Sequence, residues 1–188
     1  MTSLILIGPP GAGKGTQAEL LTKRLGIPHI STGAIFRANA AAGTALGAKA
    51  AEYMSRGEYV PDEVTNAMVR NRLGEPDTVG GFLLDGYPRT LEQVGELDTI
   101  LADLGRTLGS VVEITADPAE VTARLLARAA KEGRADDTEE VITRRLQVYA
   151  EQTEPIIAVY AQRGLVRKVD GLGTADEVHE RIVAALGA

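Results

Sequence analysis

The segment GPPGAGKGT at residues 8–16 constrains the fold of this chain more than any other feature. It follows an apolar run at residues 4–7 and opens a stretch, residues 16–25, whose apolar side chains recur with helical spacing. Strand, glycine-rich turn and helix in this order are the context that a phosphate-binding loop requires. The glycines let backbone N–H groups point at an anion, while the helix N-terminus adds partial positive charge and Lys14 adds a full one. We therefore favour a phosphate cradle over a plain glycine-rich turn.

Apolar runs alternate with helical stretches along the chain, which is typical of a parallel sheet wrapped by helices. We expect strands at residues 4–7, 28–30, 82–84, 111–114 and 165–169. We expect helices at residues 16–25, in three pieces between 32 and 73, and at 91–104, 118–130, 139–160 and 175–186. The pattern predicts one doubly wound α/β domain, residues 1–188, with a five-stranded parallel sheet and helices on both faces. The long insertion between the second and third strands predicts a small lobe.

The composition argues against several classes of protein. A net charge of −6 does not suit general nucleic-acid binding, which needs a basic surface. The chain has no run of eighteen apolar residues and no basic leader at its start, so we expect no membrane span and a cytoplasmic protein. With no cysteine and two distant histidines, His29 and His179, zinc is not expected. His29 is expected to pack against its apolar strand, and nothing demands more than a monomer.

Charged residues suited to phosphate chemistry follow several of the expected elements. Asp85 directly follows the strand at residues 82–84, where it can orient metal-bound water or merely cap a turn. Beside a phosphate loop we favour the first role, with Mg²⁺ as the metal. Many phosphate loops have Ser or Thr directly after the lysine, but this chain has Gly15 there and the hydroxyl at Thr16, so the Mg²⁺ is expected to keep more of its water.

Six arginines are candidates for gripping phosphate oxygens, because a guanidinium is a planar fork of donors. They are Arg37, Arg89, Arg124, Arg128, Arg134 and Arg145. In the helix expected at residues 139–160, Arg145 borders the apolar face and can reach a cleft, whereas Arg144 points away from it. The other arginines, among them Arg24, Arg56 and Arg181, are expected to be surface charges.

At this point the sequence resembles the adenylate kinases, and the resemblance covers nearly the whole chain. Its motifs appear in the order of that family: GPPGAGKGT, STG with Arg37 five residues beyond Thr32, DGYPRT at residues 85–90, RADD at 134–137 and VDGLGT at 169–174. The short stretch between Arg128 and Arg145 resembles the short-lid form. Ala34 and Tyr87 depart from the family pattern, in which an acidic residue and Phe are usual.

The resemblance implies transfer of the terminal phosphoryl group of MgATP to AMP, giving two ADP, and a role for each matching residue. The residues implied for the ATP phosphates are Gly11, Ala12, Gly13, Lys14, Gly15 and Thr16, with Arg128 beside them. Arg124 would stack on the ATP base, and the Gly173 backbone would meet it. The residues implied for AMP are Thr32, Arg37, Gly86, Tyr87, Pro88, Arg89, Gln93, Arg134 and Arg145, with the backbone of Glu58, Tyr59 and Val60. Gln93 would read the adenine edge. The residues implied as catalytic are Lys14, Arg89, Arg128, Arg134 and Arg145: Lys14 would contact the group in transit, and Arg134 and Arg145 would close over it.

The resemblance also implies two mobile parts and leaves two rivals open. Residues 31–60 would form an AMP-binding lobe and residues 129–138 a short lid, which together keep water from the reaction. One rival is a UMP/CMP-type kinase, which shares the cradle and the arginines. The other is a nucleotide-operated switch or ATPase, although a guanine-reading Asn-Lys-x-Asp is absent. Because the AMP phosphate is itself the nucleophile, the reaction demands no catalytic histidine.

Overall fold

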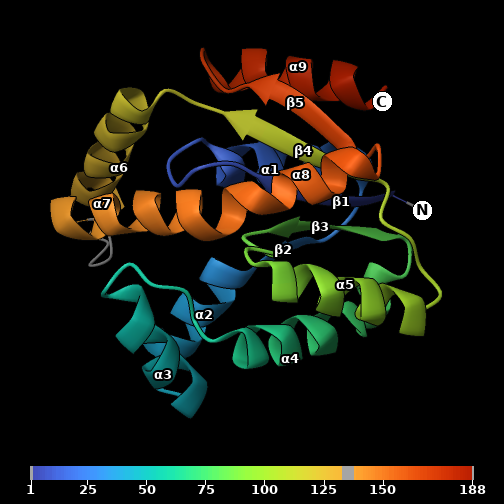
Figure 1. The fold of residues 1–188 in the computed structure, drawn as a ribbon, viewed down its shortest axis with the longest axis horizontal. Helices are drawn as coiled ribbons and strands as arrows, with labels where there is room; N and C mark the ends of the chain where they lie inside the picture. Colours follow the sequence, from blue (N-terminus) through green and yellow to red (C-terminus); the bar gives the residue numbers. More distant parts are fainter. Residues whose placement is uncertain (1, 133–137, 188) are drawn as a thin grey trace.

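A twisted parallel sheet forms the centre of the molecule (Figure 1). The computed structural model describes residues 2–132 and 138–187, and all their side chains except those of Arg128, Lys131 and Glu132. The sheet has five strands in the order β2-β3-β1-β4-β5, and every neighbouring pair is parallel, as the sequence predicts. The strands are β1 (Thr2–Ile7), β2 (His29–Ser31), β3 (Gly81–Asp85), β4 (Ser110–Thr115) and β5 (Val166–Asp170).

Helices cover both faces of this sheet, which confirms the doubly wound fold. The helices are α1 (Lys14–Leu25), α2 (Thr32–Ala41), α3 (Ala45–Met54), α4 (Asp62–Leu73), α5 (Leu91–Asp103), α6 (Pro118–Glu132), α7 (Glu139–Val148), α8 (Glu154–Gln162) and α9 (Ala175–Leu186), with a short 3₁₀ turn η1 (Pro76–Thr78). Side chains along β1 alternate between the two faces. Leu4 and Leu6 pack with α1 and α9, whereas Ile5 and Ile7 belong to the core beneath α4, α5 and α8.

The prediction of one helix over residues 139–160 is wrong. The chain forms α7 and α8 with a π-helical segment between them, η2 (Tyr149–Thr153). Pro155 lies in the first turn of α8, and proline has no N–H to continue the hydrogen-bond ladder of the preceding helix. π-helical segments are rare and are often found at functional sites.

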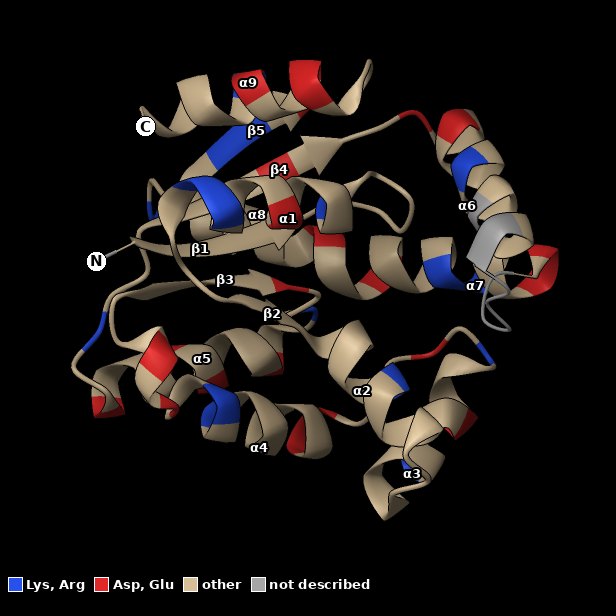
Figure 2. Ribbon diagram, turned by 180° about the vertical axis from the view of Figure 1, so that it is seen from behind, with Lys and Arg blue, Asp and Glu red and all other residues tan. Residues whose placement is uncertain are grey.

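Helices α2 and α3 form a unit that extends away from the sheet (Figure 1). Phe36, Ala50 and Val60 make a small apolar cluster there that is separate from the two clusters against the sheet. Acidic and basic residues are interspersed along most of the helices (Figure 2). In the part of the chain that the structure describes, no helix combines the length and the apolar character needed to cross a membrane.

Candidate functional site

The glycine-rich loop lies between the end of β1 and the start of α1. Gly8 passes so close to β4 that a Cβ there would lie 2.5 Å from the Ile114 carbonyl oxygen. Gly13 is the N-cap of α1 and has a φ of 88°, a conformation that glycine adopts without strain. Glycine offers no side-chain acceptor to the first N–H groups of α1, so the cap leaves them to an anion in the loop. The helix begins at Lys14, two residues before the expected start. The loop thus presents a helix N-terminus to an anion.

Lys14 bends back over this loop. Its Nζ donates to the carbonyl oxygens of Gly8 and Pro9, at 2.7 and 2.9 Å. Within the loop, Ala12 is buried, whereas Gly15 and Thr16 face solvent in the first turn of the helix. The ammonium group therefore lies at the mouth of the loop, where a phosphate would meet it.

Asp85 ends β3 in the register position opposite Leu6 of β1, and thus lies beside the loop. Its carboxylate Oδ2 is 3.4 Å from His29 Nε2 at the start of β2. Burial alone would raise the pKa of Asp85, but the hydrogen bond with His29 and the positive charges of Lys14 and Arg89 outweigh it and hold the pKa below its usual value. Asp85 is therefore an ionised carboxylate at a nearly buried site. His29, which we expected only to pack, is its neighbour.

A cavity of about 650 Å³ lies between α2, the segment after α3 and the loop after β3. Of the residues implied for AMP, those lining it are Thr32, Arg37, Glu58, Tyr59, Val60, Gly86, Arg89, Gln93 and Arg145. The structure thus brings together side chains that lie more than a hundred residues apart in the sequence.

A second cavity of about 400 Å³ adjoins the first and opens toward the phosphate loop. Lys14 and Gly8 line it on one side, and Pro88 lines it near the cis peptide bond that follows Tyr87. Arg89 and Arg145 line both cavities, so they stand between the loop and the first cavity. Arg145 reaches the cleft, as the helical spacing predicts, whereas Arg144 lines a separate outer hollow.

The side chain of Gln93 is oriented by hydrogen bonds at both ends of its amide. Its Oε1 accepts from the Arg89 backbone N–H at 2.7 Å, and its Nε2 donates to Asp62 Oδ1 at 2.6 Å. Asp62 also accepts from Thr90 Oγ1 at 2.7 Å through its other oxygen. Tyr87 does not reach the cavity: it is fully buried, and its hydroxyl donates to Asn66 Oδ1 at 2.8 Å. The amide therefore has one fixed orientation at the cavity wall.

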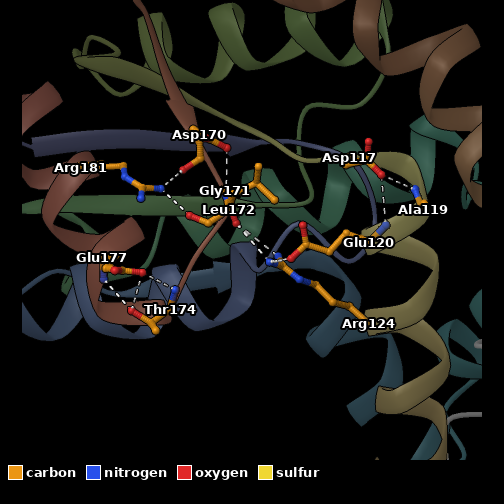
Figure 3. A network of polar contacts seen from close by, with 10 residues as sticks. All are labelled: Asp117, Ala119, Glu120, Arg124, Asp170, Gly171, Leu172, Thr174, Glu177 and Arg181. Atoms are coloured by element: carbon orange, nitrogen blue, oxygen red, sulfur yellow. Dashed lines mark hydrogen bonds and ion pairs between the residues drawn. The ribbon is translucent and has the colours of Figure 1, made fainter.

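The loop after β5 is tied to two helices through its backbone carbonyls (Figure 3). Arg124 of α6 bonds to the Gly171 oxygen at 3.3 Å and forms an ion pair with Glu120. From α9, Arg181 donates to the carbonyl oxygens of Asp170 and Leu172, at 3.0 and 2.5 Å. Gly173 follows with a φ of 110°. Arg181 is exposed, as expected, but it holds the loop that carries Gly173, a contact that the sequence does not reveal.

Parts of the predicted site lie outside the described residues. Arg134 belongs to residues 133–137, and the side chain of Arg128 is likewise outside them, although its backbone lies in α6. Of the expected lid, residues 129–138, the structure therefore describes only residues 129–132 and 138, and of Lys131 and Glu132 the backbone alone.

Sequence reasoning missed several residues of the site. Asp62 and Thr153 contact predicted residues, yet no motif marks them. Thr90 ends the DGYPRT motif, but no role is predicted for it. The only signal available for Asp62 is its place three residues after Tyr59, at the start of a helix. An aspartate there suggests ordinary helix stabilisation.

Two adjoining cavities, one at the phosphate loop and one lined by arginines, suit two nucleotides whose phosphates face each other. The fold and the site thereby define a nucleotide kinase of the phosphate-loop class, because a protein that only hydrolyses one nucleotide has no use for the second cavity.

Comparison with known proteins places the chain within this class. A model of the adenylate kinase family matches residues 6–165. An adenylate kinase of Nocardioides sp. is 61% identical over 183 residues, which cover 97% of this chain and 96% of the relative. Adenylate kinases of Kocuria rhizophila and Thermobifida fusca are 59% and 55% identical, over 99% and 97% of both chains. The chain belongs to the adenylate kinase family, and it is a phosphotransferase.

Proposed function

We propose that the protein transfers the terminal phosphoryl group of MgATP to AMP, with ATP phosphates in the glycine-rich loop and AMP in the arginine-lined cavity. The observation that carries this assignment is the pair of adjoining cavities that share Arg89 and Arg145, with Lys14 on the loop side. Phosphoryl transfer requires positioning and charge stabilisation more than covalent chemistry. Guanidinium groups between the two ligands would offset the repulsion of their phosphates and stabilise the charge of the transition state.

Within this proposal, the arginines and Lys14 contact different phosphate groups of the two nucleotides. Arg37, whose guanidinium lies against Gly33, and Arg89 would hold the AMP phosphate. Lys14 and Arg145 would contact the group in transit, together with Arg134. Arg124 and the Gly173 backbone would bind the ATP base, and Arg128 its phosphates. Each such contact contributes on the order of 2–4 kcal/mol to lowering the barrier.

Asp85 fits a magnesium ion that is held mainly through water. The carboxylate is ionised, nearly buried and adjacent to the phosphate loop, and hard oxygen ligands are what Mg²⁺ prefers. Gly15 offers no hydroxyl directly after Lys14. The ion would neutralise phosphate charge on the bound nucleotide, while Asp85 holds the surrounding water in place.

The orientation of Gln93 supports adenine as the acceptor base. A glutamine amide can donate two hydrogen bonds and accept two. With one donor used by Asp62 and one acceptor site by Arg89, an N–H and a lone pair remain for the cavity. Adenine presents an amino donor beside a ring acceptor, whereas uracil presents a carbonyl acceptor beside a ring donor, in the opposite order.

The same proposal covers the organisation of the chain. Residues 31–60 would act as the AMP-binding lobe of a single domain, residues 1–188, and the separate apolar cluster around Phe36 supports this. Residues 129–138 would act as the lid. A monomer, a cytoplasmic location and the lack of zinc and nucleic-acid partners stay predictions.

A comparison of acceptors tests the proposal. With saturating MgATP, we expect kcat/KM for AMP to exceed that for UMP by at least about a hundredfold, since a mispaired buried amide costs several kcal/mol. Cytosine presents the same donor and acceptor pair as adenine, so CMP tests the fit of the larger purine ring and not the amide. Equal or faster turnover with UMP or CMP would instead support the pyrimidine nucleotide kinase.

A further inference from the structure

Tyr59 lies beside both cavities and contacts Arg89 and the η2 residue Thr153. It belongs to the segment between α3 and α4, and it lines both cavities. The guanidinium carbon of Arg89 is 4.9 Å from the centre of its ring, within the range of a cation–π contact. Its hydroxyl is 2.7 Å from Thr153 Oγ1. The resemblance to the family implies a role only for the backbone of Tyr59, so these side-chain contacts are additional.

Thr153 links Tyr59 to Arg89 by a second route. It is the last residue of η2 and is buried, with 4% of its surface exposed. Its Oγ1 donates to the Arg89 carbonyl oxygen at 2.9 Å, and a hydroxyl has one proton to give. The Tyr59 hydroxyl must therefore be the donor to Thr153. The polar chain runs in one direction, from Tyr59 through Thr153 to the Arg89 backbone.

Arg89 is thus held at several points. Its guanidinium lies over the Tyr59 ring, Thr153 donates to its carbonyl oxygen, and its own Nε donates to the Gly86 carbonyl oxygen at 2.8 Å. An arginine side chain loses much rotational freedom when it is fixed, and a protein that fixes it in advance binds the ligand more tightly. The ring and hydroxyl of Tyr59 supply part of this preorganisation.

The segment that carries Tyr59 also packs against α7. Gly57 lies so close that a Cβ there would be 2.9 Å from the Val141 carbonyl oxygen and 3.2 Å from the Arg145 side chain. With the segment in this position, Tyr59 contacts both Arg89 and Thr153. Occupation of that position and the orientation of Arg89 are therefore linked.

We propose that Tyr59 is a positioning residue for the acceptor phosphate, which acts by holding the Arg89 guanidinium when residues 57–60 lie against α7 and η2. This inference rests on the proposed function, because it takes Arg89 as a ligand of the AMP phosphate. It adds a side chain, and the buried hydroxyl of Thr153, to the residues that determine acceptor affinity.

Calorimetric AMP binding to the full chain, together with KM values for both substrates, tests the proposal. From the size of exposed to partly buried cation–π contacts, we expect Tyr59→Leu to weaken AMP binding by about 5- to 20-fold. Tyr59→Phe keeps the ring and loses one hydrogen bond, so a loss of about two- to fivefold is expected. The KM for ATP should stay unchanged in both variants. Thermal melting checks that each variant is folded.

Tyr53 provides a matched control on α3. Arg56 stacks on its ring at 5.1 Å, but Tyr53 lines neither of the two cavities. Tyr53→Leu therefore removes a contact of the same kind and should change AMP affinity by less than about twofold. A loss as large as that of Tyr59→Leu would mean that the stability of the segment, and not Arg89, determines the affinity, and would overturn the proposal.

A double variant distinguishes a failure of this inference from a failure of the proposed function. In Arg89→Ala, which should bind AMP weakly, adding Tyr59→Leu should change the affinity by less than about twofold, because residues that act through one another are not additive. An undiminished effect of Tyr59→Leu in that background would overturn the positioning role, as would no effect in the wild type. If Arg89→Ala itself left AMP binding unchanged, the proposed function would be wrong at this residue.

Discussion

Replacing Asp62 by alanine removes a carboxylate that orients Gln93 at the wall of the AMP cavity. Both of its oxygens accept hydrogen bonds, from Gln93 Nε2 at 2.6 Å and Thr90 Oγ1 at 2.7 Å. Gln93 is 2% exposed, and an unpaired buried donor costs about 1–3 kcal/mol. The bond to Thr90 adds about 0.5–1.5 kcal/mol. An acidic residue in the first turn of a helix adds about 0.3–1 kcal/mol.

These contributions give a total loss of about 2–5 kcal/mol in the free energy of unfolding for Asp62→Ala. For a chain of this length, that lowers Tm by roughly 4–20 °C. Because the Gln93 amide also loses its fixed orientation, the KM for AMP should rise while the KM for ATP stays unchanged. The preference for AMP over UMP should fall at the same time.

Urea and thermal unfolding, with steady-state kinetics for AMP, UMP and ATP, measure these effects. Asp98→Ala is a suitable control, because Asp98 forms a two-bond ion pair with Arg163 on the surface, with both distances at 2.8 Å. That change should cost at most about 1 kcal/mol and leave KM values unaltered. If Asp62→Ala lost no more stability than Asp98→Ala and kept its preference for AMP, our account of Gln93 would be refuted.

The remaining predictions concern the phosphate loop, the metal site and the donor loop. Lys14→Ala should lower kcat by about two to three orders of magnitude with an unchanged melting temperature, measured by coupled assay and circular dichroism. Because the pKa of Asp85 is lowered in the folded protein, its charge stabilises the fold at pH values above the usual pKa of about 4, and this contribution is lost as the pH falls further. The stability difference between wild type and Asp85→Asn, measured by urea unfolding, should therefore shrink below about pH 4, and a difference that grew there would contradict the sign. Arg181→Ala should raise the KM for ATP by about three- to tenfold and leave that for AMP unchanged, whereas Arg163→Ala should alter neither.

The fold could be predicted because its signals are local. Continuous apolar runs such as residues 82–84 and 111–114 predict buried parallel strands, and glycines at helix ends mark the boundaries. The prediction of one helix over residues 139–160 failed at η2, because the apolar periodicity continues through the segment where the hydrogen-bond ladder changes. Periodicity reports which face is buried, but it does not distinguish a continuous helix from one with a π-helical insertion.

The site could be predicted only where motifs mark it. The phosphate loop, Asp85 and Arg89 lie in contiguous motifs, so sequence alone located them. The support for these residues comes from elsewhere in the chain: Thr153 is 64 residues from Arg89, and Asp62 is 31 residues from Gln93. Such contacts depend on how the helices pack against one another, and a single threonine or aspartate carries no sign of its partner.

The most direct test of the central claim is the stoichiometry of ATP use with and without AMP. If two nucleotides meet across Arg89 and Arg145, MgATP alone should be consumed only very slowly, and added AMP should accelerate its consumption by orders of magnitude, with two ADP formed for each ATP. Consumption of ATP at the same rate without AMP, with release of inorganic phosphate, would contradict the two-ligand site.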